Sequence, residues 1–121
     1  MMTVCSNAPN FPQAGYFKDD ARNRIFAFVL PADADAATVR QHAERQLHTS
    51  GQVTAAYYWR DGATHPRASL TKAQSLLAAT ELVDEEVYDR YAFVMIRSPD
   101  GTISFADCEA DPAEALCQQA W

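Results

Sequence analysis

The strongest constraint on the fold is an unbroken apolar run at residues 92–96. A strand with one wet face alternates apolar and polar residues, so an unbroken run predicts a strand that is covered on both faces. Residues 98–101, Ser-Pro-Asp-Gly, then predict a turn, because proline presets φ and glycine accepts a positive φ. Ile103 and Phe105 alternate with polar residues in the strand that follows. Residues 91–107 therefore predict a hairpin whose first strand lies inside a sheet.

Two further strands are expected ahead of this hairpin. Residues 24–30 are nearly all apolar, and Pro31 ends them because proline has no N–H to donate to a β-ladder. Residues 53–59 form the next strand, whose side chains divide between two faces. One face carries Val53, Ala55, Tyr57 and Trp59, and the other carries Thr54, Ala56 and Tyr58.

The first helix is predicted between these two strands, over residues 36–48. Asp33 or Asp35 supplies the N-cap, and Gly51 stops the helix. A narrow apolar stripe at helical spacing predicts close packing on the sheet. Its members are Ala36, Val39, Ala43 and Leu47.

Two more helices are expected before and after the hairpin. Thr71 and Gln74 have the spacing of a capping box, which predicts a helix that continues to about Leu82. Residues 111–114, Asp-Pro-Ala-Glu, predict the last helix, because aspartate caps it and proline suits its first position. Residues 1–23 are rich in Asn, Pro and Gly and predict an irregular N-terminal arm.

The predicted order of elements is β-α-β-α-β-β-α, which indicates an α/β fold, or α+β as an alternative. We expect a single globular domain at residues 24–121, with a mixed sheet packed by two to three helices. The thioredoxin fold has this order of elements, and the resemblance lies in the order alone. Residues 31–37 hold no Cys-x-x-Cys, and no proline directly precedes the third strand.

Charge and hydropathy narrow the function classes. The 121-residue chain has a formal net charge of −6, and an acidic surface disfavours binding to nucleic acid. No apolar run reaches the roughly 18 residues of a membrane span, so no membrane is expected. The first residues show no signal peptide, and an odd number of cysteines favours the cytoplasm. Removal of a signal peptide would make a periplasmic or secreted location the alternative.

Cys108 and Cys117 flank the start of the last predicted helix and allow three interpretations. In the first interpretation, which we favour, they pack as thiols without a chemical role. In the second, they form a disulfide in an oxidising compartment. The third interpretation is thiol catalysis by Cys108 at a helix N-terminus. The acidic neighbours Asp107, Glu109 and Asp111 disfavour a thiolate there.

Metal and cofactor signals are weak in this sequence. His42, His48 and His65 do not have the spacing of metal ligands on a helix, so neither a metal nor another cofactor is expected. An acidic run at residues 81–89 lacks the pattern of a calcium loop, and it is interpreted as a solvated face.

The segment at residues 57–72 combines aromatic and basic side chains within an acidic protein. Aromatic residues and arginine are enriched at protein interfaces. This segment is therefore the candidate interaction surface, with core packing of Tyr57 and Trp59 as the alternative. The surface comprises Tyr58, Trp59, Arg60, His65, Arg67 and Lys72.

We expect a small non-catalytic protein that acts through contact with a protein partner or through self-association. One alternative is a thiol-dependent enzyme on a thioredoxin-like scaffold that uses Cys108. The other is a small-ligand-binding domain with an aromatic pocket lined by Tyr57, Trp59 and Phe93.

Overall fold

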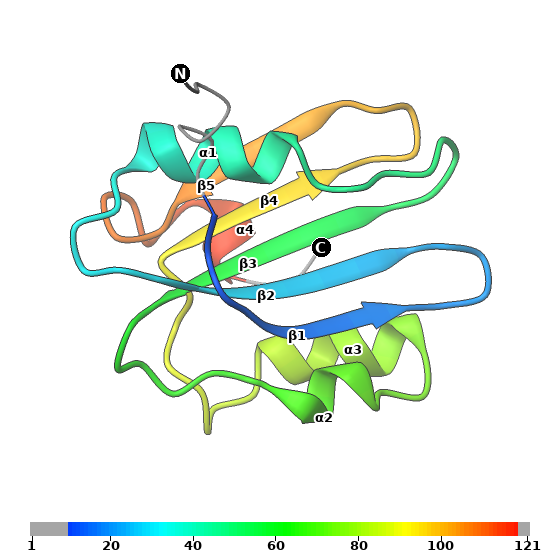
Figure 1. The fold of residues 1–121 in the computed structure, drawn as a ribbon, viewed down its shortest axis with the longest axis horizontal. Coiled ribbons are helices and arrows are strands. Elements are labelled where there is room, and N and C mark those ends of the chain that lie inside the picture. Colours follow the sequence, from blue (N-terminus) through cyan, green and yellow to red (C-terminus); the bar gives the residue numbers. More distant parts are fainter. Residues whose placement is uncertain (1–9, 119–121) are drawn as a thin grey trace, which may run out of the picture.

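A five-stranded mixed sheet forms the centre of the molecule in a computed structural model that describes residues 10–118 (Figure 1). The strands lie in the order of the chain, β1-β2-β3-β4-β5. β2 and β3 are parallel, whereas the other neighbouring pairs are antiparallel. The strands are β1 Gln13–Lys18, β2 Arg24–Leu30, β3 Thr54–Arg60, β4 Phe93–Arg97 and β5 Ile103–Asp107.

Helices cover both faces of this sheet. α1, Ala36–Glu44, packs on one face, where Val39 and Ala43 join the core. The other face is covered by α2 (Ala68–Thr71), α3 (Leu76–Val83) and α4 (Ala115–Gln118). The parallel pair β2 and β3 needs a crossover connection, and α1 is the helix in that crossover. The protein is thus a single small domain of the mixed α/β class.

The predicted strands and hairpin are confirmed. β2 has the predicted bounds, and β4 and β5 pair as the predicted hairpin, with Gly101 at a φ of +91° in the turn. From Arg24 onward the elements follow the predicted order, with one addition: the short helix α2 lies ahead of the second predicted helix, which is α3. The run at residues 92–96 lies between β3 and β5, and its side chains enter the cores of both faces.

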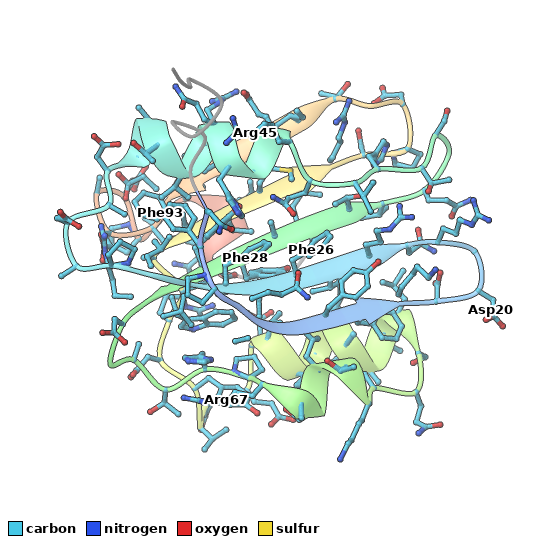
Figure 2. All side chains as sticks on the ribbon, viewed as in Figure 1. Asp20, Phe26, Phe28, Arg45, Arg67 and Phe93 are labelled. Atoms are coloured by element: carbon cyan, nitrogen blue, oxygen red, sulfur yellow. A yellow bond between two sulfur atoms is a disulfide. The ribbon has the colours of Figure 1, made fainter. Side chains whose placement is uncertain are left out.

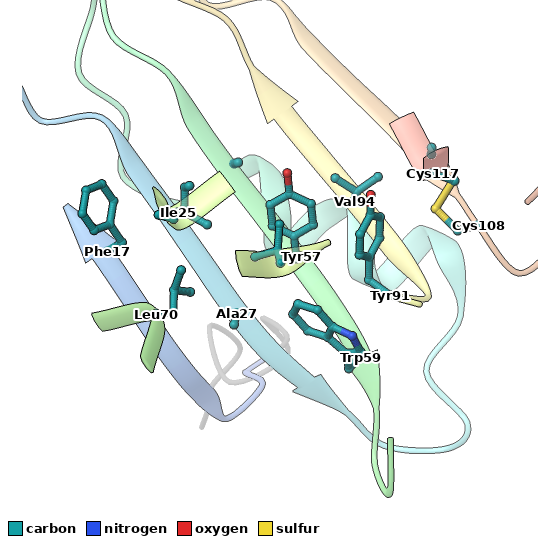
Figure 3. Close-up of a cluster of buried hydrophobic side chains, with 14 residues drawn as sticks. Phe17, Ile25, Ala27, Tyr57, Trp59, Leu70, Tyr91, Val94, Cys108 and Cys117 are labelled. Atoms are coloured by element: carbon teal, nitrogen blue, oxygen red, sulfur yellow. A yellow bond between two sulfur atoms is a disulfide. The ribbon is translucent and has the colours of Figure 1, made fainter. Parts of the chain in front are cut away.

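Large aromatic side chains fill the core on the face covered by α2, α3 and α4 (Figure 3). Tyr57, Trp59 and Tyr91 are almost fully enclosed there. Their polar atoms are satisfied: Trp59 Nε1 donates to the carbonyl oxygen of Asp89 at 2.8 Å, and Tyr91 Oη donates to that of Leu116 at 3.0 Å. The first bond fastens the segment before β4 to β3, and the second fastens α4 to that same segment.

The core on the α1 face is also aromatic and contains one imidazole. Figure 2 shows Phe26, Phe28 and Phe93 on this face of the sheet. His42 of α1 inserts among the rings, with its Nδ1 2.7 Å from Tyr58 Oη and its ring centroid 4.5 Å from that of Phe28. Burial, with a smaller effect of the Arg45 charge, lowers the pKa of His42 to about 4.

The irregular conformation predicted for the N-terminal arm is wrong for residues 13–18, which form the edge strand β1. Residues 1–9 of that arm lie outside the described residues. Gly15 concealed the strand in the sequence because glycine weakens strand propensity. In the structure its missing side chain has a use: a Cβ there would lie 2.6 Å from the backbone oxygen of Arg67. Gly15 thus lets α2 approach β1.

Replacing Gly15 with alanine is expected to destabilise the protein by about 2 kcal/mol, because a backbone oxygen must move to admit the methyl group. Urea denaturation measures the loss. Gly62→Ala is an unsuitable control because of its positive φ, so Ala14→Gly on the same strand is the comparison. An unfolding free energy unchanged by Gly15→Ala would contradict the close approach.

Three helix boundaries differ from the predicted ones. α1 ends at Glu44, and Leu47, which was placed on its inner stripe, is 66% exposed. The cap of α3 is Ser75, whose Oγ accepts from Ala78 N at 3.1 Å, so the capping box at Thr71 is wrong. α4 begins at Ala115, because residues 112–114 form turns. Thr71 and Ser75 are competing caps ahead of α3, and Ser75 is the one that caps it.

Candidate functional site

A groove of about 740 Å³ opens at the carboxyl ends of the parallel strands β2 and β3. Its walls come from residues 12–14, Val29 and the loop at residues 61–67. A second hollow of about 420 Å³ adjoins it and shares Pro12, Val29 and Asp61. In sheets with parallel strands, ligands bind beyond the carboxyl ends of those strands. The position of the groove thus makes it the candidate functional site.

Hydrogen bonds hold the loop that forms one wall of the groove. Asp61 N donates to Leu30 O at 2.8 Å, which ties the start of the loop to the end of β2. Asp89 fixes the middle: its Oδ2 accepts from Thr64 N at 2.7 Å, and its own N donates to Thr64 O at 2.8 Å. A wall anchored at both places is formed before a ligand binds.

His65 and Arg67 are the basic side chains in this wall. His65 Nδ1 lies 3.0 Å from Pro66 O and must be the donor, because a carbonyl oxygen only accepts. This bond leaves Nε2 for a ligand, and the ring packs beside Trp59 at a centroid distance of 6.0 Å. Arg67 is exposed, and no ion pair joins it to any other residue among residues 10–118. Figure 2 shows it below the sheet, beside the loop.

The structure therefore brings together two of the six residues of the predicted interaction surface. The surface position predicted for Tyr58 and Trp59 is wrong, because both are fully buried, on opposite faces of the sheet. The predicted pocket of Tyr57, Trp59 and Phe93 is wrong for the same reason, since all three belong to the cores. Lys72 is exposed at the end of α2 and does not line the groove.

Arg60 is occupied by contacts within the protein. Its guanidinium donates to both carboxylate oxygens of Glu109, at 3.0 and 2.8 Å, and to Ala34 O at 2.7 Å. It also lies over the ring of Phe93, 5.4 Å from the centroid. The hydrogen bond from Arg60 holds the pKa of Glu109 below its usual value. Arg60 thus joins the loop after β2 to the loop after β5, and whether it also contacts a partner stays a prediction.

Cys108 and Cys117 form a disulfide, with an S–S distance of 2.03 Å and a Cα–Cα distance of 5.5 Å. This is the second of the three interpretations of these cysteines, and it replaces the favoured one. Both residues are buried, and the bond joins the end of β5 to α4 (Figure 3). Cys108 consequently carries no free thiol for nucleophilic catalysis.

Acidic residues after α3 have partners within their own region. Asp84 Oδ1 accepts from Arg90 Nη1 at 3.1 Å, and Asp89 holds the groove loop as described above.

Within residues 10–118, no group of three or more His, Cys, Asp or Glu side chains is arranged to hold a metal ion.

Sequence patterns did not point to several residues of the groove. Pro12, Gln13 and Asp61 line it because β1 runs beside β2 and because β3 ends at Arg60. A segment classed as an irregular arm offers no signal for this wall. The closeness of Pro12 and Asp61 depends on strand pairing, which propensity does not report.

No helix among residues 10–118 is both long enough and apolar enough to cross a membrane. Comparisons of the chain with protein-family models, with curated proteins and with solved structures found no match, so the groove and its side chains are the basis for a proposed function.

Proposed function

We propose that this protein is a non-catalytic binding domain whose groove holds an extended segment of a partner protein. The observation that carries this proposal is the pair of basic side chains, His65 and Arg67, in a wall at the carboxyl ends of β2 and β3. The bound segment would place an acidic residue against this pair.

Charge complementarity supports an acidic residue in the bound segment. Arg67 has no carboxylate partner among the residues that the structure describes, and His65 directs Nε2 away from its bond to Pro66. A carboxylate from a partner would gain a charge-assisted hydrogen bond from Arg67, and a second one from His65 Nε2 in the doubly protonated form of the ring.

The adjoining hollow supports an apolar residue next to the acidic one. Phe11, Val29, Leu30 and Pro31 contribute to its lining. Because the hollow and the groove share three residues, a ligand in contact with both must extend along them. An extended peptide has this shape, and alternate side chains would enter the two depressions.

Selection from a randomised peptide display library tests the proposal, with Arg67→Glu and Lys72→Glu as matched charge reversals. We expect the unchanged protein to enrich peptides that carry an acidic residue near an apolar one. Arg67→Glu should weaken binding of those peptides by about tenfold or more, the effect of losing one charge-assisted contact. Lys72→Glu, outside the groove, should leave the affinity unchanged.

Two results would contradict a peptide groove. One is the absence of enrichment, and the other is an equal loss of binding in both variants.

A volume of about 740 Å³ also lies in the range of small-molecule sites, so a small acidic ligand is the second candidate. Thermal stabilisation by small carboxylic acids, lost in Arg67→Glu, would favour that candidate.

We also propose that the protein works in an oxidising compartment, such as the periplasm or the exterior of the cell. The disulfide between Cys108 and Cys117 supports this location, because cytosolic thiols are kept reduced. The odd number of cysteines indicated the cytoplasm, whereas this disulfide favours the alternative, a periplasmic or secreted location.

A further inference from the structure

A row of basic side chains crosses the sheet at the end opposite the groove. Arg24 of β2 pairs with Thr54 of β3, and Thr54 pairs with Arg97 of β4, so the three residues lie side by side. Lys18 extends the row onto β1 by pairing with Arg24. In Figure 1 this is the end of the sheet toward which the arrowheads of β1 and β4 point.

The three basic side chains, Lys18, Arg24 and Arg97, lie on the α1 face together with that of Thr54. Side chains two residues apart along a strand share a face. The residues two positions away from the row belong to the core under α1 or pack against it: Tyr16, Phe26, Ala56 and Met95. The basic row therefore lies on the same face of the sheet as the core under α1, next to the edge of that core.

Arg24 is a buried cation with only neutral partners among residues 10–118. The residue is 8% exposed. Its Nε donates to Tyr16 Oη at 3.2 Å, and its Nη1 donates to Thr49 Oγ1 at 2.8 Å. No ion pair within the described part of the chain neutralises it. A buried charge without a counter-charge is costly, and an anion would remove much of that cost.

Arg97 is the second guanidinium of the row, and it is partly buried. Its Nε donates to Gly101 O at 3.3 Å. This bond holds the guanidinium group at its Nε end and leaves both Nη atoms for other acceptors. The carboxylates of the nearby turns accept hydrogen bonds from residues of the same turns. Asp19 accepts from Asn23, and Asp100 accepts from Ser98 and Thr102. Within residues 10–118, neither carboxylate forms an ion pair with the row.

His48 lies against Thr54, between the two arginines in the row. Thr54 Oγ1 gives its proton to Leu47 O at 3.1 Å, so it accepts the Nδ1–H of His48 at 2.9 Å. His48 Nε2 is enclosed and has no hydrogen-bond partner among the described residues. Burial, with smaller effects of the Arg97 and Arg24 charges, lowers the pKa of His48.

We propose that Arg24 and Arg97 bind an oxyanion in front of Thr54, supplied by a small acidic ligand, and that His48 becomes a third donor if it takes up a proton together with the anion. The guanidinium groups of Arg24 and Arg97 stand on the two strands that flank β3 and present several N–H donors toward the space in front of Thr54. Charge-assisted bonds from guanidinium groups to an oxyanion are strong. The partners of Arg24 and Arg97 hold both side chains in place before binding, so little side-chain entropy is lost.

NMR titration with inorganic phosphate at low ionic strength tests this site. The expected result is a saturable shift of the Arg24 and Arg97 Nε–H signals and of the His48 ring signals. Arg97→Gln should weaken phosphate binding by about tenfold, the effect of one lost charge-assisted contact. Lys72→Gln, with the same change of charge on α2, should leave it unchanged.

Parallel titrations with sulfate and acetate identify the oxyanion that the site prefers. Saturation by any of the three anions at Arg24, Arg97 and His48 supports the site. A linear, unsaturated response, or an affinity equal in the original protein and Arg97→Gln, would overturn the proposal. Arg97→Gln keeps the test decisive even if Arg24→Gln fails to fold, because Arg97 is the less buried of the two.

Titration of His48 in saturating sulfate gives an independent readout, since sulfate keeps its charge across the range. The charged groups that face the ring are Arg24 from β2 and Arg97 from β4, with neutral Thr54 from β3. An anion between them should raise the pKa of His48 relative to sulfate-free buffer. An unchanged or lowered pKa would exclude His48 from the site.

Discussion

Replacing Cys108 and Cys117 together with alanine is expected to lower the free energy of unfolding by about 3 kcal/mol. The disulfide closes a loop with a sequence separation of 9, and a cross-link of this length restricts the unfolded chain by roughly that amount. The bond also holds α4 against β5, so its loss should release α4 first. Urea denaturation with and without reductant measures the difference.

Cys5→Ala is the matched control, because it removes a cysteine that is not part of this disulfide. Reductant should destabilise Cys5→Ala and the original protein alike, and it should have no effect on the double variant. Thiol labelling of the denatured protein should modify one cysteine without reductant and three after reduction. Labelling of all three without reductant would show that the disulfide does not form.

Acidification from pH 7 to pH 5 is expected to cost about 2 kcal/mol of stability through His42 alone. Its pKa is about 4 in the folded protein and about 6.5 in the unfolded chain. The unfolded state therefore binds more protons below pH 6.5, and stability falls as the pH drops from 6.5 toward 4. The burial of His42 beside Phe28 and Tyr58 is the cause.

Urea denaturation at several pH values from 7.5 to 5 checks this dependence against His42→Gln. The variant should lose most of the slope, even if it is less stable at every pH. His48→Gln should remove a smaller part, because the lowered pKa of His48 acts in the same direction. A slope that His42→Gln leaves intact would mean that other groups cause the acid sensitivity.

The strands were predictable where apolar runs and turn residues agreed. β2 and the hairpin of β4 and β5 met this condition, since Pro31 and residues 98–101 mark their ends. β1 was missed because its short sequence contains Gly15, whose role depends on the approach of α2. Helix ends were less accurate, since Ser75 and Thr71 are competing caps in the same polar segment.

The candidate site was less predictable than the fold. Tyr58, Trp59, Arg60, His65 and Arg67 are close in sequence, but the alternation of β3 sends Tyr58 and Trp59 into opposite cores. Only the residues of the loop after β3 can line a groove at its end. The basic row of Lys18, Arg24 and Arg97 is distributed over three strands, and strand pairing alone brings it together.

The agreement between chain order and sheet order affects how the protein reaches its native state. Each strand pairs with its neighbours along the chain, so assembly never requires a later strand to insert between two that are already joined. The widest closure is between β3 and β4, across residues 61–92, and the entropy of closing a loop rises only slowly with its length. The antiparallel pairs β1–β2 and β4–β5, each joined by a short turn, are the pairings expected to form most rapidly.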